Sequence, residues 1–318
     1  MARTWAPKVC DSGRNSHLSS VTIVSWEEGS VLTRRMLRKL EWWLIHMGPR
    51  RDITVETPNG RLTFDSKDCL IGKYLYVRRS YEIHEIKGAI DYIRQEGFLS
   101  NRRRNTVLDV GANLGMIVIS LLRAGYFERA IAIEPAPNSF RLLEHNLRQN
   151  DLHDRVYTYR CALSSAAGEV DLEISKDNSG DHRVRHTGDA GFFHEEKRRT
   201  LKVPAETLDH IFETHSELRR EEVGLVWLDI QGHEGWFLHG ARKILKERIP
   251  VVAEIWPYAI LRSGMSRIRF CEIVSVLFTD FYVLPGRGRC KQPISELGGL
   301  FDAFSKPREM CQVVLTSG

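Results

Sequence analysis

The chain has 318 residues, of which 42% are hydrophobic and 27% are charged, which is enough for one large globular α/β domain with an extension. A net charge of +5 does not by itself indicate nucleic-acid binding, and no apolar run approaches the roughly 20 residues that span a bilayer. Six cysteines without a C-x-x-C pair, and a start without the apolar core of a signal peptide, favour reduced thiols and a cytoplasmic protein.

The first segment, residues 1 to about 29, is expected to be irregular. A basic amphipathic helix is then predicted from Ser30, its cap, to Gly48, where Gly48-Pro49 ends it. Its apolar residues recur at helical spacing and are Leu32, Met36, Leu40, Trp43, Leu44 and Met47. We expect this face to pack against the chain's own domain or against a second subunit. Docking on a membrane is the less favoured alternative.

Residues 52–68 predict a β-hairpin, because alternating runs flank the turn signal Asn59-Gly60. A helix over roughly Tyr81 to Gly97 follows. We expect residues 51–100 to cap a cofactor-binding catalytic domain of residues 101–318. Tyr81 and Glu82 would then close over the site.

Strands and helices alternate from Thr106 onward, which is typical of a mostly parallel sheet with helices on both faces. The expected strands are Thr106–Val110, Ala130–Glu134, Val156–Cys161, Leu225–Ile230, Val251–Ile255, Phe281–Leu284 and Gln312–Thr316. The expected helices are Met116–Arg123, Pro137–Gln149, His233–Lys246 and Arg267–Thr279. In such sheets a ligand binds at the carboxyl ends of the strands.

A glycine-containing turn, Asp109-Val-Gly111-Ala-Asn113-Leu-Gly115, follows the first of these strands. Its glycines permit a tight turn and close approach of the backbone to a ligand. The acidic residue precedes the glycines, and the pattern does not match the dinucleotide fingerprint G-x-G-x-x-G. A carboxylate there suits a cationic ligand such as S-adenosylmethionine. Glu134 ends the next strand and can accept both hydroxyls of a ribose, although NAD enzymes use the same device.

Five stretches of the sequence resemble one known family: VLDVGANLG, AIEPAPNSFRLLEHNL, CALSS, VWLDIQGHEGWFLHGARKIL and VVAEIWP. Together they are similar to the FkbM family of class I S-adenosylmethionine-dependent methyltransferases, over about Asp52 to Glu254. The resemblance implies a Rossmann-like fold whose seven-stranded sheet ends in an antiparallel strand. It also implies S-adenosylmethionine as cofactor, and methyl transfer mostly to oxygen of secondary metabolites or sugars. Residues 1–50 have no counterpart.

The resemblance also implies a set of cofactor-binding residues. The glycine turn would hold the methionine moiety, the acid after the second strand would hold the ribose, and the third strand would flank the adenine. The residues in this set are Asp109, Gly111, Asn113, Gly115, Glu134, Pro135, Ala162 and Asp229.

Methyl transfer to a hydroxyl needs an aligned acceptor and a nearby base. Asp229 ends the fourth strand, where the methyl should point, and would orient the acceptor or serve as base. Glu234 begins the next helix and is either a cap or a catalytic group, while His233 is expected to face solvent. Glu254 ends the fifth strand, and the aromatic residues from Trp256 onward would line an acceptor pocket or belong to the core.

A polar segment from Asp177 to Asp189 is expected to fold over the site as a lid. It contains Asp181 and His182 as a candidate acid–base pair, and histidine is the usual base near neutral pH. Arg183 or Arg185 would hold an anionic acceptor. The acidic and imidazole groups of this region match no standard metal pattern, so no metal site is expected.

The sequence therefore predicts an S-adenosylmethionine-dependent methyltransferase that acts on a hydroxyl of a sugar or a sugar-bearing or secondary metabolite. The alternatives are N-methylation of a small metabolite, a nucleotide-dependent dehydrogenase, and a non-catalytic cofactor-binding scaffold. The expected partner is a small-molecule or saccharide acceptor, with no nucleic acid and no integral membrane segment. The Trp42-Trp43 helix would suit a homodimer.

Overall fold

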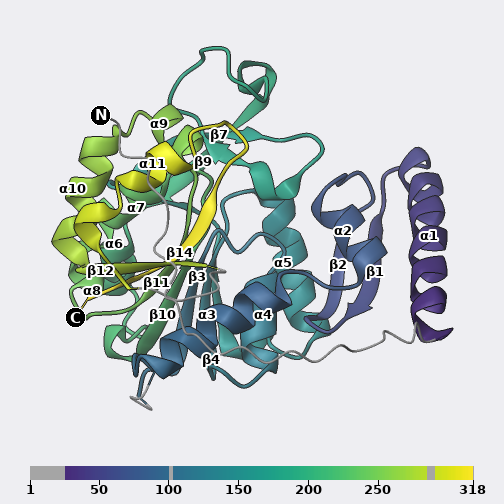
Figure 1. Cartoon of the computed structure of the whole chain (residues 1–318), viewed down its shortest axis with the longest axis horizontal. Coiled ribbons are helices and arrows are strands. Elements are labelled where there is room, and N and C mark those ends of the chain that lie inside the picture. The colour runs from purple at the N-terminus through teal and green to yellow at the C-terminus, as the bar shows by residue number, and fades with distance from the viewer. Residues whose placement is uncertain (1–25, 100–102, 285–290, 318) are drawn as a thin grey trace, which may run out of the picture.

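The computed structural model describes residues 26–99, 103–284 and 291–317. Its centre is an eight-stranded sheet with helices on both faces (Figure 1). Along the sheet the strands are β13 (Gln292–Pro293), β12 (Asp280–Leu284), β14 (Cys311–Thr316), β11 (Val251–Ile255), β10 (Val223–Leu228), β3 (Thr106–Val110), β4 (Arg129–Ile133) and β5 (Val156–Tyr159). Apart from the two-residue β13, these are the seven predicted strands. β14 runs antiparallel to both of its neighbours, as predicted.

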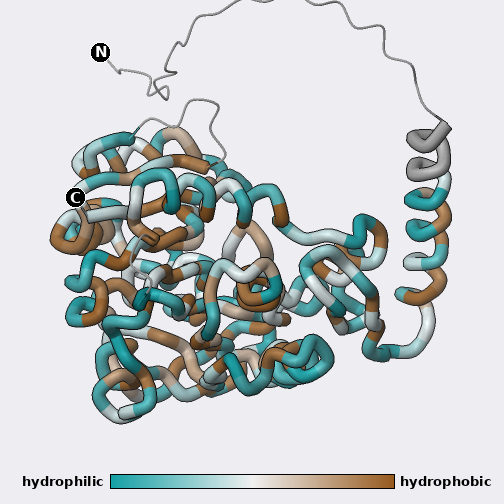
Figure 2. Tube along the Cα trace, turned by 90° about the horizontal axis from the view of Figure 1, so that it is seen from below, coloured by the Kyte–Doolittle hydropathy of each residue, from teal (hydrophilic) through white to brown (hydrophobic). Residues whose placement is uncertain are grey.

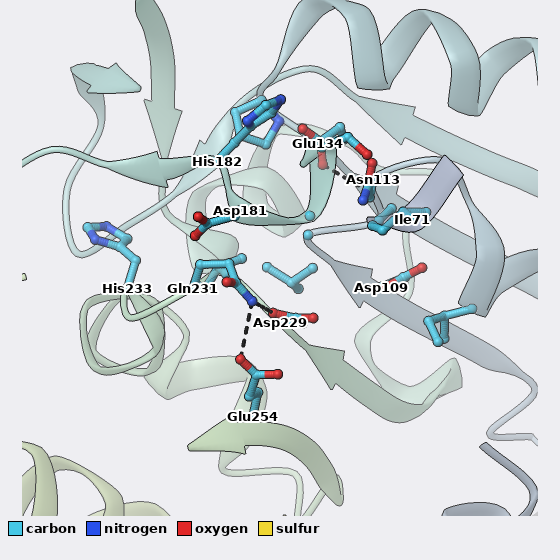
Figure 3. Close-up of a pocket in the computed structure, with 18 of the residues that line it drawn as sticks. Ile71, Asp109, Asn113, Glu134, Asp181, His182, Asp229, Gln231, His233 and Glu254 are labelled. Carbon is cyan, nitrogen blue, oxygen red and sulfur yellow. Dashed lines mark hydrogen bonds between the residues drawn. The ribbon is translucent and has the colours of Figure 1, made fainter. Parts of the chain in front are cut away.

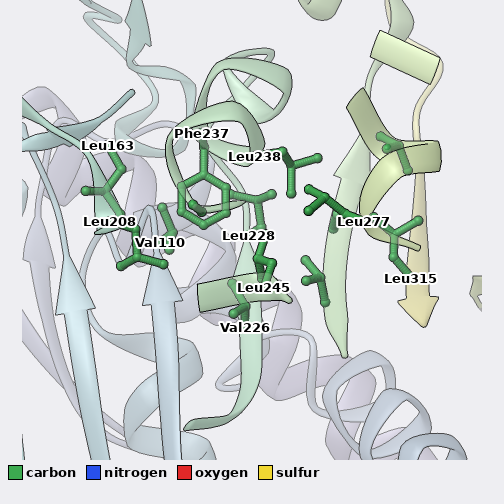
Figure 4. Packing of buried hydrophobic residues seen from close by; sticks show 14 of the residues in the cluster. Val110, Leu163, Leu208, Val226, Leu228, Phe237, Leu238, Leu245, Leu277 and Leu315 are labelled. Atoms are coloured by element: carbon green, nitrogen blue, oxygen red, sulfur yellow. The ribbon is translucent and has the colours of Figure 1, made fainter. Parts of the chain in front are cut away.

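The two faces of the sheet carry separate hydrophobic cores, because successive side chains of a strand point to opposite sides. On one face, Val110, Val226 and Leu228 pack against Phe237 and Leu208 (Figure 4). The helices of this face are α6 (Leu208–Thr214), α7 (Glu234–Gly240), α8 (Arg242–Leu245) and α10 (Arg267–Leu277). The helices of the opposite face are α3 (Ile83–Gln95), α4 (Met116–Arg123) and α5 (Pro137–Gln149). The Rossmann-like α/β fold is thereby confirmed.

The prediction of one helix over His233–Lys246 is wrong, since α7 and α8 are separate helices. Ala241 lies between them with φ −116°, outside the helical range. A Cβ on Gly240 would lie 2.0 Å from the backbone oxygen of Ser164, so the chain approaches another backbone closely there. Two further short helices are α9 (Pro257–Arg262), which follows β11, and α11 (Gly299–Ala303), which precedes β14.

The hairpin β1 (Asp52–Thr57) and β2 (Gly60–Asp65) is confirmed, but its turn is Pro58-Asn59 instead of Asn59-Gly60. The Asn59 side chain is buried and ties the hairpin to the rest of the molecule. Its Nδ2 donates to the carbonyl of Tyr81 at 2.8 Å and to Oγ of Ser120 at 2.7 Å. Helix α2 (Ile71–Arg78) follows the hairpin and was not predicted.

The hairpin and α3 share one hydrophobic core with the sheet, because Leu62, Phe64 and Ile90 belong to the same buried cluster as Val107 and Leu225. Among the described residues, no separate core marks the boundary expected near residue 100. The division into an extension, a capping segment and a catalytic domain therefore stays a prediction.

Helix α1 (Trp26–Met47) begins earlier than its predicted cap, Ser30, which lies inside the helix. Of the segment expected to be irregular, residues 1–25 lie outside the described part of the chain. The predicted apolar face was expected to pack against the chain's own domain or against a second subunit. The first alternative is wrong, since Met36 and Leu40 are 67% and 64% exposed, and the second stays a prediction. None of the helices in the described residues combines the length and the apolarity needed to cross a bilayer.

A second, four-stranded sheet lies between β5 and β10 in the sequence and was not predicted. Its strand order is β6 (Ala162–Leu163), β9 (Arg199–Glu206), β7 (Gly168–Ile174) and β8 (Arg183–Val184). β7 pairs with β8 and β9 in antiparallel fashion. The segment expected to be a lid therefore includes a strand of this sheet.

Candidate active site

A cavity of about 380 Å³ lies at the carboxyl ends of β3, β4, β10 and β11 (Figure 3). The ends of these strands contribute Asp109, Glu134, Asp229 and Glu254 to its wall. Residues at the start of α2, residues just before α3, the second sheet and the chain before β14 close the other sides. This is the position at which open parallel sheets bind ligands.

The glycine turn after β3 forms one side of the cavity. Gly111 has φ +89° and Asn113 has φ +48°, both in the left-handed region. The backbone N–H groups of Gly111 and Ala112 both donate to the carbonyl of Ile133 at 3.0 Å. These bonds hold the turn against the end of β4.

We expect Gly111→Ala to lower the free energy of unfolding by about 3 kcal/mol or more, measured by urea unfolding. A Cβ at Gly111 would lie 1.8 Å from the backbone oxygen of Asp229, so backbone must move. Gly125→Ala is the matched control, since Gly125 also has positive φ but no atom within 4 Å of its Cβ position. Its cost should be only about 1–2 kcal/mol. If both variants lose the same free energy of unfolding, the close approach of Gly111 to the backbone of Asp229 is contradicted.

Asp109 is a buried carboxyl group without full hydrogen bonding. It is 1% exposed, and Oδ2 has no partner within the described residues. Burial, followed by repulsion from Asp229, raises its pKa to about 8. A cationic ligand in the cavity would supply both the missing partner and the compensating charge.

Glu134 is held rigidly at the end of β4. Its Oε1 accepts from the backbone N–H of Ala136 at 2.8 Å, and its Oε2 accepts from that of Asn113 at 2.9 Å. Burial raises its pKa to about 7, although these two hydrogen bonds oppose the shift. Each oxygen keeps a second acceptor position, so the fixed carboxylate can still receive two hydroxyl groups of a ribose.

Asp229 and Glu254 are linked by one amide group (Figure 3). Nε2 of Gln231 donates to Oδ1 of Asp229 at 2.6 Å and to Oε2 of Glu254 at 3.2 Å. Burial raises the pKa of Asp229, and burial with repulsion from Asp229 raises that of Glu254 well above its usual range. Since the shorter hydrogen bond favours charge on Asp229, we assign the shared negative charge to Asp229 and the proton to Glu254.

The lid segment contains a buried ionic network, centred on Arg183. Its side chain is 5% exposed and pairs with Asp181 and with Glu195. Arg198 also pairs with Asp181, so both carboxylate oxygens of Asp181 face guanidinium groups. Arg185 donates to the carbonyls of Glu195 and Arg198 at 2.7 and 3.0 Å. The hypothesis that Arg183 or Arg185 holds an anionic acceptor therefore has no geometric support, and Asp181 is poorly suited to accept a proton.

His182 lines the cavity, but its ring is not arranged as a base. Nδ1 accepts from the backbone N–H of Ser175 at 3.1 Å, which leaves the proton on Nε2. Burial lowers its pKa to about 4. In Figure 3 the ring lies toward Glu134, away from Glu254. The structure thus argues against the predicted role of His182 as general base.

A family model and a sequence relative both point to a methyltransferase. The family model described as Methyltransferase FkbM domain matches residues 109–273. The chain belongs to the FkbM methyltransferase family. A relative, Methyltransferase sdnD of Sordaria araneosa, is 27% identical over 185 residues, which cover 51% of this chain and 70% of that protein.

Two solved structures are similar to this FkbM-family chain at low identity. One is an O-methyltransferase from Bacillus cereus in complex with SAH, with 10% identity, a TM-score of 0.40, and coverage of 74% of this chain and 83% of that one. The other is a putative O-methyltransferase from Klebsiella pneumoniae, with 8% identity, a TM-score of 0.40, and coverage of 75% and 82%.

Most of the residues predicted for the FkbM-family site do line the cavity. They are Asp109, Gly111, Asn113, Glu134, Pro135, Ala162, Asp181, His182 and Asp229. Gly115 does not. It has φ +83° and lies where a Cβ would contact Leu143, so it serves the packing of α4 on α5.

His233 lies differently from its prediction, and the position of Glu234 at the start of α7 favours the structural over the catalytic alternative. Glu234 is 1% exposed and does not line the cavity; its Oε1 accepts from the backbone N–H groups of Ile230 and Gly232. It therefore braces the turn after β10. His233 was expected to face solvent but is 3% exposed and hydrogen-bonds to Ser164 at 2.9 Å.

Several cavity residues were missed from the sequence. Gln231 lies within the resembling block VWLDIQGHEG, so its position two residues after Asp229 was an available signal. Phe193, Arg308 and Met310 have no local signal, because only the folding of distant segments brings them to the wall. Within the described ranges, no group of three or more histidine, cysteine or acidic residues is arranged for a metal ion.

Proposed function

We propose that this FkbM-family chain transfers a methyl group from S-adenosylmethionine to a hydroxyl oxygen of a small acceptor, a sugar or a sugar-bearing or secondary metabolite. The observation that carries the proposal is Asp109, a buried carboxyl group beside the glycine turn with an oxygen that has no partner in the described residues. A dinucleotide would bring its pyrophosphate against this acid and the neighbouring carboxylates. The cationic cofactor of a methyltransferase would be attracted to them.

The residues around the glycine turn fit the proposed cofactor. Asp109 and the turn at Gly111 would hold the cationic methionine end, and Asn113 would continue this wall. Glu134 would receive the ribose hydroxyls, and the apolar surface at Ala162 would receive the adenine. S-adenosylmethionine supplies a methyl group already activated by a sulfonium centre, so the protein needs to orient the acceptor and take its proton.

Asp229 is the proposed proton acceptor. S-adenosylmethionine, when bound, would supply the methyl group and be left as neutral S-adenosylhomocysteine, and Asp229 would take the proton of the acceptor hydroxyl. Gln231 and the protonated Glu254 would hold Asp229 in place. The half-buried Phe193 provides aromatic surface in the same cavity on which a sugar ring can pack. Trp256 lies beside it but is 4% exposed, with the Arg183 guanidinium 4.4 Å from its ring centroid.

Calorimetry with S-adenosylmethionine, S-adenosylhomocysteine and NAD tests the cofactor assignment. We expect both sulfur compounds to bind and NAD not to bind. Ligand at a hundred times its dissociation constant should also stabilise the fold by about 2.7 kcal/mol. Binding of NAD alone would overturn the proposal.

An acceptor screen tests the second half of the proposal. Release of S-adenosylhomocysteine would be followed with panels of saccharides, glycosylated metabolites and small amines. Turnover only with amines would replace O-methylation by N-methylation. Binding without turnover on any panel would favour the non-catalytic scaffold.

A further inference from the structure

Helix α1 lies at the edge of the molecule and contains many hydrophobic residues (Figure 2), and one of its faces carries large apolar side chains that are exposed in the described chain. The residues of this α1 face are Met36, Leu37, Leu40, Trp43, Leu44 and Met47, with exposed fractions from 54% to 67%. At 100° per residue they occupy a stripe about 120° wide along the helix. Such a stripe normally faces a core or a partner.

The opposite side of α1 is fixed to the molecule, so the α1 face has a defined outward direction. Trp42 is 4% exposed, and its ring centroid lies 5.6 Å from that of Tyr76 on α2 and 6.1 Å from that of Phe64 on β2. Nζ of Lys67 donates to the carbonyl of Gly48 at 2.6 Å, just after the helix. The helix therefore does not need to turn to expose its apolar side.

The α1 face is accompanied by positive charge. Between residues 33–47 of α1 and residues 71–79 around α2, the exposed cations are Arg34, Lys39, Lys73 and Arg78. Arg35, Arg38 and Arg79 are half-buried, and Arg38 donates to the carbonyl of Val77 on the anchored side at 3.5 Å. Glu41 is the single acid in these two stretches, and it accepts a hydrogen bond from the Tyr76 hydroxyl at 3.0 Å. Among the residues from 33 onward whose side chains the structure describes, no carboxylate lies within ion-pair distance of the exposed cations. Glu27 and Glu28 precede the face, at the beginning of α1.

We propose that the α1 face docks on the surface of a lipid bilayer that contains anionic headgroups. The apolar stripe would enter the boundary of the acyl chains, and the cations would face the headgroup phosphates and carboxylates. Trp43 provides an indole ring, which is typical of the membrane–water interface. A second copy of the chain is less suited as occupant, because it would bring two basic helices together without opposite charge.

Sedimentation of the full chain with vesicles tests this proposal. The probes are vesicles of phosphatidylcholine alone and of phosphatidylcholine with phosphatidylserine. We expect binding to the anionic vesicles that weakens with salt, and at least about tenfold weaker binding for Leu40→Glu/Trp43→Glu. The matched control is Ile268→Glu/Val276→Glu on α10, where the two side chains are 73% and 70% exposed. This control should bind like the wild type.

Three results would overturn the proposal. The first is no sedimentation of the wild-type chain with anionic vesicles, and the second is equal sedimentation of Leu40→Glu/Trp43→Glu. The third is a wild-type dimer in light scattering that this variant converts to monomer without any vesicle binding, which would assign the α1 face to a second copy. Circular dichroism of each variant checks that the fold is kept, as expected for exposed positions.

Discussion

Asp109→Asn should weaken binding of S-adenosylmethionine by about 30- to 3,000-fold, measured by calorimetry at pH 7. Removing one member of a buried charge pair costs about 2–5 kcal/mol, and each 1.4 kcal/mol is tenfold in affinity. The proposed pair joins the cationic methionine end of the ligand to a carboxyl group that is 1% exposed. Unchanged affinity would contradict the proposed position of the cofactor.

Asp109→Asn should also abolish the release of a proton that accompanies cofactor binding to the wild type. In the free protein the pKa of Asp109 is about 8, so the group is mostly protonated at pH 7. A bound cation lowers that pKa, and binding to the wild type should therefore release about one proton more than binding to the variant. Wild-type affinity should rise with pH toward 8. Binding enthalpies measured in two buffers of different ionisation enthalpy give the number of protons.

The melting temperature without ligand serves as the control that the Asp109→Asn variant still folds. The folded pKa of Asp109 lies above its unfolded value, so the stability that this group contributes is fully present below pH 3.8 and is lost as the pH rises toward 8. Asparagine does not ionise and avoids this loss. Without ligand at pH 7, the variant should therefore melt no lower than the wild type.

Asp229→Asn should lower kcat by about 100- to 10,000-fold on any acceptor that the wild type methylates. The carboxylate of Asp229 lines the cavity and accepts a hydrogen bond from Gln231, and the amide of the variant cannot take a proton. Because burial raises the pKa of Asp229, the wild-type rate should fall on the acid side at a higher pH than an ordinary aspartate predicts. Release of S-adenosylhomocysteine measures the rate, and calorimetry should show a cofactor affinity within about tenfold of wild type.

Two substitutions separate Asp229 from the other candidates. Glu254→Gln should be much milder, since glutamine resembles the protonated glutamic acid that we assign there. His182→Ala should keep turnover within about tenfold, because the Nδ1 atom of His182 is already engaged by a backbone N–H. If His182→Ala loses turnover and Asp229→Asn does not, the assignment of the base is wrong.

The two helices that follow the glycine turn in the sequence show which features local signals can predict. α4 and α5 have their predicted bounds, Met116–Arg123 and Pro137–Gln149. Gly115 lies at the start of the first, and Pro137 is the first residue of the second, where its fixed φ favours a helix. These determinants lie within a few residues of the elements that they start, so the sequence contains them.

The second sheet shows where local signals end. β7 has the burial pattern of a largely exposed strand, with Leu172 and Glu173 as its buried residues. Val170, Leu172 and Ile174 alternate with acidic residues, which is a local signal for a strand, but only the structure shows that this strand pairs with β9. The pairing of Arg183 with Glu195 and Asp181 follows from this sheet, and a sequence contains no measure of which guanidinium groups are already paired.

The sequence by itself determined the alternation of strands and helices, the glycine turn with its acid, and the acids at the strand ends, because each depends on neighbouring residues. Only the tertiary structure decided which of these groups remains available for chemistry. Burial leaves Asp109 without a full set of partners, a backbone N–H sets the tautomer of His182, and Glu234 braces a turn. It also decided that the apolar side of α1 faces outward, since Trp42 and its contacts across residues 64–76 anchor the other side. Protonation, pairing and exposure depend on groups far apart in the chain, and packing alone brings those groups together.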